Sequence, residues 1–164
     1  MARARPVPGF ADSGSFCEAA ARAVRIRVEE VFERAEGVLD IEDIERVHDM
    51  RVATRRLRAA MEIFAPCFAK KQRRALLNEV KALADALGAR RDADVAIVAL
   101  ERVGDAMPAA DLPGVEHLVS ELRDEQQQAN DELAQALDRI EAGGLHERLL
   151  ALTVERAPEP AVTM

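Results

Sequence analysis

The chain has 164 residues, a formal net charge of −7 and no Trp or Tyr; 49% of its residues are hydrophobic and 32% are charged. This length fits one domain with a buried core, and the abundance of Ala, Leu, Glu and Arg, all good helix formers, predicts an all-α protein. No apolar run approaches the ~20 residues that a membrane-spanning helix needs, so we expect no membrane partner. Cys17 and Cys67 have no metal-ligand spacing, and we predict that both are buried reduced thiols of a cytoplasmic protein.

Two helices are predicted in the first part of the chain. Ser15 and Glu18 have the spacing of a capping box, so a helix begins there, and Gly37 is expected to end it. Asp40 is a plausible N-cap of the second helix, which stops at the residue before Pro66 because proline disfavours helical backbone in its predecessor.

Two shorter helices are predicted next. Apolar residues recur at helical spacing over residues 68–87, and Gly88 is expected to close this third helix. A fourth helix is expected over residues 92–103 with Asp92 as its N-cap. Gly88 and the residues up to Asp92 would then form a turn.

The last long helix, residues 115–142, carries apolar positions at alternating spacings of four and three, which is a heptad pattern. A short amphipathic segment follows over residues 145–154. We therefore predict an antiparallel helical bundle of residues 15–154, resembling a four-helix bundle with a long C-terminal helix. Residues 1–14 and 155–164 are expected to be a disordered lead and tail.

Positive charge is concentrated in the middle of this acidic chain. Residues 46–91 contain twelve Lys and Arg against four Asp and Glu, whereas the rest contains eleven against twenty-six. Residues 47–58, VHDMRVATRRLR, hold four arginines and a histidine. A basic module inside an acidic frame predicts an anionic partner.

Four of these residues share one face of the second predicted helix. At 100° per residue, His48, Arg51, Arg55 and Arg58 fall within a sector of about 80°, opposite the apolar stripe, while Arg56 lies apart. A solvated face normally interleaves acids with bases, but this stripe has no acid between His48 and Arg58. Like charges at this spacing repel each other, and a bound polyanion would reverse that effect.

The third predicted helix extends the basic surface. Lys70, Arg74 and Lys81 lie within about 40° of one another on its polar side. If the two helices pack as neighbours they present a continuous basic wall, with Arg90 and Arg91 in the turn at its end. Arginine forks suit phosphate oxygens, and lysines act as point charges.

The stretch VHDMRVATRRLRAAMEIFAP, followed by VKALADALGARRDADVAI, resembles the conserved-histidine α-helical (CHAD) domain family over roughly residues 15–140. The shared pattern is His48, Arg51, the Arg-Arg-Leu-Arg run, Gly88 and the Arg91-Asp92 turn. The resemblance implies a helical module that binds inorganic polyphosphate without catalysis and without a cofactor. Members of the family are often found beside a triphosphatase domain or at polyphosphate granules. The predicted anion ligands are His48, Arg51, Arg55, Arg56, Arg58, Lys70, Arg74, Lys81, Arg90 and Arg91.

One departure from the family concerns size. Members are typically twice this bundle and have a second His-bearing basic helix, whereas His117 and His146 lie in acidic surroundings here. The chain therefore resembles a half-domain. We predict a homodimer that restores the double arrangement, with the heptad face of residues 115–140 as its self-complementary surface.

Other functions fit the residues less well. His48 has no second ligand at helical spacing for a metal ion, and a phosphoacceptor role would not need so many arginines. Asp92 and Asp94 could bind Mg²⁺ together with phosphate, although a helix cap and a first-turn acid explain them better.

Two binding alternatives stay open. Nucleic acid is a polyphosphate too, but the basic stretch has no exposed aromatic platform on which bases could stack. A protein-interaction or granule-coat bundle would use the heptad face instead of the arginines.

Overall fold

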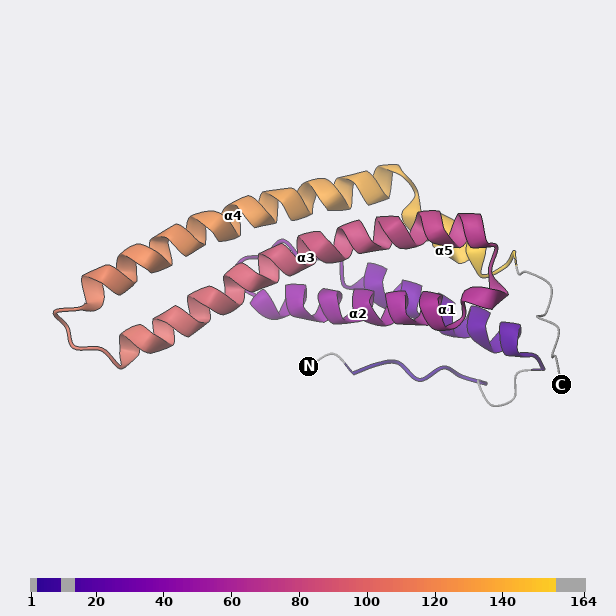
Figure 1. Cartoon of the computed structure of the whole chain (residues 1–164), viewed down its shortest axis with the longest axis horizontal. Coiled ribbons are helices and arrows are strands. Elements are labelled where there is room, and N and C mark those ends of the chain that lie inside the picture. The colour runs from indigo at the N-terminus through magenta and orange to yellow at the C-terminus, as the bar shows by residue number, and fades with distance from the viewer. Residues whose placement is uncertain (1–2, 10–13, 156–164) are drawn as a thin grey trace.

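The computed structural model describes residues 3–9 and 14–155, and in this part of the chain every regular element is helical (Figure 1). The all-α prediction is confirmed, and the helices pack antiparallel. The elements are α1 (Phe16–Glu33), α2 (Ile44–Ile63), the short 3₁₀ helix η1 (Ala65–Cys67), α3 (Lys70–Asp105), α4 (Leu112–Ala142) and α5 (Leu145–Leu152).

A long hairpin of α3 and α4 dominates the shape (Figure 1). The helices α1, α2 and α5 gather along the half of this hairpin that contains the start of α3 and the end of α4, and the other half projects beyond them. The core lies where all five helices meet. Its fully buried side chains include Val24, Val28, Met50, Leu57, Leu83, Leu87, Leu133 and Leu149.

The prediction of two separate helices over 68–87 and 92–103 is wrong, because α3 runs without interruption through Gly88 and Asp92. The buried row on α3 continues through this region at helical spacing; it consists of Leu76, Val80, Leu83, Leu87, Arg90, Asp94 and Ile97. Packing of this row outweighs the roughly 1 kcal/mol by which glycine disfavours a helix interior relative to alanine. Asp92 is therefore an exposed mid-helix residue and not an N-cap.

The heptad face of α4 is buried inside the chain. Val119, Gln126, Ala129, Leu133 and Ala136 are its buried members, and α4 packs along α3 (Figure 1). The seam that we expected to pair two copies is therefore occupied by α3.

The helix boundaries follow the predicted caps in part. Ser15 is the N-cap of α1, and its Oγ accepts a hydrogen bond from the backbone N–H of Glu18 at 3.2 Å, as predicted. The second helix begins later than expected, with Asp43 instead of Asp40 as its N-cap. The Asp40 carboxylate accepts a hydrogen bond from the N–H of Glu42 in the preceding loop.

The two cysteines form a disulfide, so the prediction of reduced thiols is wrong. Both are buried, with Cys17 2% and Cys67 0% exposed. The bond joins the first turn of α1 to η1, the elbow between α2 and α3. Disulfides are rare in the reducing cytoplasm, so the expectation of a cytoplasmic location loses the support that reduced thiols gave it.

We expect reduction of this disulfide to lower the free energy of unfolding by about 2–4 kcal/mol, since it closes a loop with a sequence separation of 50 residues. Urea unfolding with and without dithiothreitol measures this difference. The double variant Cys17→Ala/Cys67→Ala is the control and should not respond to the reductant. Equal midpoints for the wild type in both conditions would contradict the expectation.

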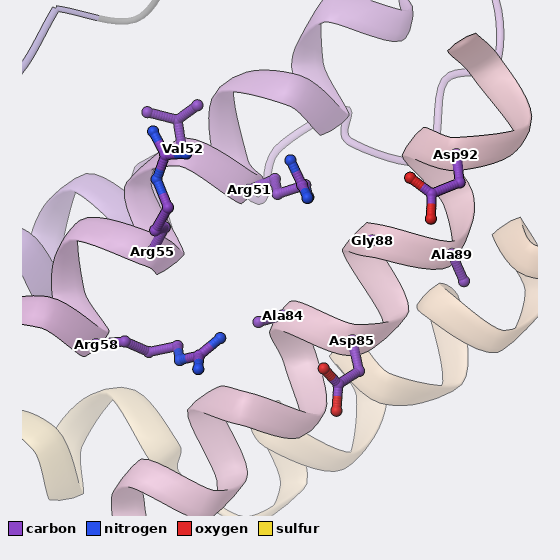
Figure 2. A pocket seen from close by; sticks show the side chains of 9 residues that line it. All are labelled: Arg51, Val52, Arg55, Arg58, Ala84, Asp85, Gly88, Ala89 and Asp92. Atoms are coloured by element: carbon purple, nitrogen blue, oxygen red, sulfur yellow. The ribbon is translucent and has the colours of Figure 1, made fainter. Parts of the chain in front are cut away.

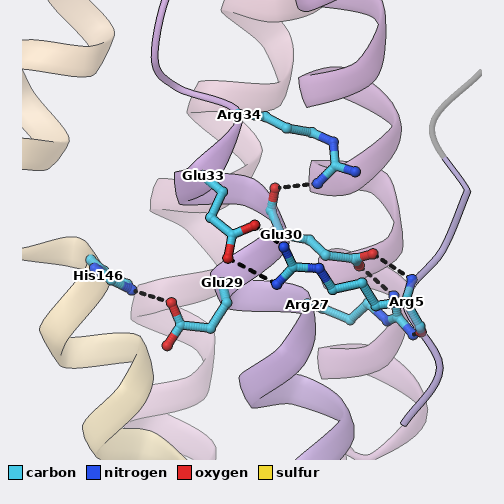
Figure 3. Close-up of polar contacts among 7 residues, drawn as sticks. All are labelled: Arg5, Arg27, Glu29, Glu30, Glu33, Arg34 and His146. Carbon is cyan, nitrogen blue, oxygen red and sulfur yellow. Dashed lines mark hydrogen bonds and ion pairs between the residues drawn. The ribbon is translucent and has the colours of Figure 1, made fainter.

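Residues 3–9, which we had assigned to the disordered lead, lie along α1 and are held by charged groups (Figure 3). The backbone N–H of Arg5 donates to Glu30 at 2.7 Å, and its guanidinium pairs with Glu33. Arg27 pairs with Glu30 and donates to the carbonyl of Arg5. Burial alone would raise the pKa of Glu30, but the hydrogen bonds from Arg5 and Arg27 outweigh it and hold that pKa below 4.5.

The remaining predictions of disorder concern the ends of the chain. Residues 1–2, 10–13 and 156–164 lie outside the described residues, so the predicted tail is untested apart from its first residue.

Candidate functional site

The polar face of α2 is turned away from the core, as its helical angles predict. Met50, Ala53 and Leu57 are fully buried on one side. On the other side Arg51 and Arg55 are exposed and Arg58 is half-buried. The apolar stripe thus fixes the rotation of α2, and this rotation directs the arginines outward.

These arginines line a groove between α2 and α3 (Figure 2). The groove has a volume of about 450 Å³. Arg51 and Arg58 point across it toward α3, while Arg55 extends along α2 (Figure 2). Its lining residues are Arg51, Val52, Arg55 and Arg58 from α2 and Ala84, Asp85, Gly88, Ala89 and Asp92 from α3.

No described residue forms a hydrogen bond or an ion pair with the side chain of Arg51, Arg55 or Arg58. The Nε of Arg58 is moreover enclosed by the protein and unsatisfied among those residues. A buried donor without an acceptor costs about 1–3 kcal/mol. An anion in the groove would supply acceptors for the guanidinium nitrogens that face it.

Several arginines outside the groove pair with carboxylates. Arg46 pairs with Asp43 at 3.0 Å, Arg123 with Glu101 at 2.9 Å, and Arg148 with Glu79 at 2.6 Å. The carboxylate of Glu79 also raises the pKa of Arg148, chiefly through its hydrogen bond. The groove differs because its cations are adjacent to one another and have no such partners.

The α3 wall of the groove was not predicted from the sequence. Small residues, Ala84, Gly88 and Ala89, form its middle, and the carboxylates of Asp85 and Asp92 flank them (Figure 2). We had interpreted Gly88 as a helix terminator and Asp92 as a cap. Asp85, Gly88 and Asp92 follow one another at spacings of three and four residues, which places them on one face of a helix. This spacing was the signal in the sequence from which the wall could have been predicted.

The other predicted ligands lie outside the groove. His48 and Arg56 are half-buried on α2 and do not line it. Lys70 and Arg74 are exposed and Lys81 is half-buried. At 100° per residue these three lie on the face of α3 that carries Gly88, so they continue the basic surface toward the start of α3.

Arg90 is in the interior, and its prediction as an anion ligand is not supported. Its side chain is 0% exposed and pairs with Asp94 at 3.2 Å. The Gln126 amide of α4 donates to the same carboxylate at 2.7 Å. Burial lowers the pKa of Arg90 and raises the pKa of Asp94, which shows that the pair only partly offsets its own desolvation.

Arg91 connects α3 to the start of α2. It donates from Nη1 to the carbonyl of Ile44 at 3.0 Å and from Nη2 to the Glu45 carboxylate at 3.4 Å. Its side chain is 16% exposed. The predicted Arg-Asp turn is therefore a helical segment whose arginines hold neighbouring elements in place.

A metal site at Asp92 and Asp94 is not formed, because one side chain is exposed on α3 and the other is buried with Arg90. Across residues 3–9 and 14–155 no group of three or more His, Cys, Asp or Glu is placed to hold a metal ion. The helices described are also too short or too polar to span a membrane.

Together these features define an all-α protein with an arginine-lined groove between two antiparallel helices. The model of the CHAD domain family matches residues 22–163, and the chain belongs to this family. The resemblance seen in the sequence is thereby confirmed. A search of curated proteins finds no match.

Proposed function

We propose that this protein is a non-catalytic binding module for inorganic polyphosphate or a similar flexible polyanion, and that the ligand lies in the groove between α2 and α3. The observation that carries this proposal is the set of three adjacent arginines without a partner among the described residues. Their guanidinium groups would bind phosphate oxygens by charge-assisted hydrogen bonds.

The two walls of the groove have different electrostatic roles. The arginines on α2 attract the ligand, whereas Asp85 and Asp92 on α3 repel negative charge. Neither carboxylate is within ion-pair distance of an arginine in residues 3–9 and 14–155. A slender chain can stay against the α2 wall, but a broad anion would meet the carboxylates as well.

The same chain can leave the groove along α3. Lys81, Arg74 and Lys70 follow at helical spacing on the groove-facing side. They would add point-charge contacts beyond the arginines. His48 and Arg56 are close to the arginines in sequence and contribute at most to the edge of this surface.

Nucleic acid and protein partners are the competing ligands. Phe68 is 3% exposed and Phe64 is half-buried, so neither offers an open face to a stacked base. The heptad face, which a protein partner would have used, is covered by α3. Both observations favour an unbranched polyphosphate.

The test is a binding titration with long-chain polyphosphate over a series of salt concentrations, with single-stranded and duplex DNA as competitors. We expect polyphosphate to bind more tightly than either DNA, with an affinity that falls steeply as salt rises, as it does where cations contact phosphates. Absence of binding at low salt would overturn the proposal. A preference for DNA would assign the groove to nucleic acid instead.

Self-association and location stay predictions. Because α3 covers the heptad seam, a homodimer would need another surface, and the projecting end of the α3–α4 hairpin exposes Val103, Met107 and Leu118. Sedimentation equilibrium measures the mass in solution, and a monomer at all concentrations would exclude the dimer. Association with polyphosphate granules requires such binding, so absence of binding in the titration would exclude it.

A further inference from the structure

Gly88 occupies a position that neither backbone geometry nor packing reserves for glycine. It lies inside α3 with a helical backbone, unlike Gly37 and Gly144, which have positive φ angles. A Cβ atom built on Gly88 meets no atom within 4 Å. Gly104 in the same helix is different, because its Cβ would lie 3.2 Å from Val115 of α4.

The open space beside Gly88 is the groove itself (Figure 2). Gly88 lies between Asp85, one turn earlier, and Asp92, one turn later. With Ala84 and Ala89 it forms the uncharged part of the α3 wall. Arg51 and Arg58 point toward this wall from α2 (Figure 2). Any side chain at position 88 would occupy space in front of these arginines.

We propose that Gly88 is a specificity-determining residue of the groove, because its missing side chain leaves an uncharged passage in front of Arg51 and Arg58. An unbranched chain that is bound to Arg51 and Arg58 can pass in front of Gly88 while staying closer to the α2 wall than to the carboxylates of Asp85 and Asp92. Nucleic acids carry a sugar and a base on each phosphate, and these groups need more room beside the arginines than an unbranched chain does. This inference rests on the proposed function and adds the selectivity for unbranched chains.

The contact at Gly88 is steric. The backbone N–H groups in the middle of α3 are engaged within the helix, so they offer no hydrogen bonds to a ligand. Filling the passage should therefore lower affinity without changing the charge of the protein. This separates the role of Gly88 from that of the arginines.

The experiment compares Gly88→Leu and Gly88→Ala with the matched control Gly114→Leu. Gly114 also lies in a helix, is exposed, and has no atom within 4 Å of a built Cβ, but it is on α4 and outside the groove. Urea unfolding and circular dichroism establish that each variant is folded. Gly88→Ala should raise the urea midpoint, since alanine favours a helix over glycine.

We expect Gly88→Leu to weaken polyphosphate binding at least tenfold and to lower the ratio of polyphosphate affinity to single-stranded DNA affinity. Gly88→Ala should give a smaller loss in the same direction, and Gly114→Leu should bind as the wild type does. If Gly88→Leu binds normally while loss of the groove arginines abolishes binding, the inference is overturned and the proposed function stands. If the wild type does not bind polyphosphate, both are overturned.

Discussion

Replacing both Arg51 and Arg58 with alanine is expected to weaken polyphosphate binding about a hundredfold. Hydrogen bonds to charged groups contribute about 1.5–3 kcal/mol each, and 1.4 kcal/mol corresponds to a factor of ten. Both side chains point across the groove and have no partner among the described residues (Figure 2). Fluorescence or calorimetric titration with long-chain polyphosphate at a fixed salt concentration measures the change.

The control variant must change the net charge of the protein by the same amount as Arg51→Ala/Arg58→Ala does. Arg25 on α1 and Arg139 on α4 are exposed and do not line the groove, so the variant Arg25→Ala/Arg139→Ala should retain most of the affinity. In DNA binding, the logarithm of the affinity falls linearly with the logarithm of the salt concentration, and each lost phosphate contact reduces this slope by about one. We expect a similar reduction of the slope for polyphosphate in Arg51→Ala/Arg58→Ala and not in the control variant. An equal loss in both variants would indicate that overall charge, and not the groove, determines binding.

Replacing Asp94 with alanine is expected to lower the free energy of unfolding by about 3–5 kcal/mol, since it leaves Arg90 charged and buried without its partner. Gln126 would lose its acceptor as well. Urea unfolding measures this effect. Asp92→Ala, an exposed position two residues earlier in the same helix, should change the midpoint little.

The double variant Arg90→Met/Asp94→Leu tests why Asp94→Ala is destabilising. The cause is either the lost attraction between the two charges or the buried charge of Arg90 that is left without a partner. Replacing a buried ion pair with apolar residues of similar size is often neutral or stabilising. We therefore expect the double variant to recover the part of the stability loss that comes from the unpaired Arg90, whereas Gln126 lacks its acceptor in both variants. A double variant as unstable as the single one would show that the pair itself stabilises the α3–α4 interface.

The pH dependence of this pair has a definite sign. Burial raises the pKa of Asp94 above its ordinary value of 3.8, so the folded state binds this proton more tightly than the unfolded state. The contribution of Asp94 to stability therefore decreases as pH rises from about 4 through its folded pKa. Glu30, whose pKa is lowered, contributes in the opposite direction, and its contribution is lost as pH falls below 4.5.

Much of the fold could be predicted from local patterns. The Ser15 cap, the orientation of α2 and the end of the last long helix depend on helical periodicity and on neighbouring residues. The continuity of α3 was missed because Gly88 and Asp92 are typical of a helix end and an N-cap, and because two positions of the buried row that would have linked the segments, Arg90 and Asp94, are charged. Only their pairing at a spacing of four residues, deep between two helices, makes them compatible with the core.

Only the α2 wall of the candidate site was predicted from the sequence, for a similar reason. The arginines of α2 could be identified because charge and angle are properties of one helix. The opposite wall at Gly88 depends on how α3 packs beside α2, which a single sequence does not specify. The disulfide likewise joins residues that lie 50 positions apart in the chain.

The continuity of α3 also fixes the distance between the two ends of the proposed binding surface. From Gly88 back to Lys70 the same face of one rigid helix extends roughly 27 Å, at 1.5 Å per residue. Because no hinge divides this face, the distance between the arginine groove and the lysine end is constant. Short oligomers would contact one end only, and a chain long enough to bridge both would gain the second set of contacts at little additional entropic cost.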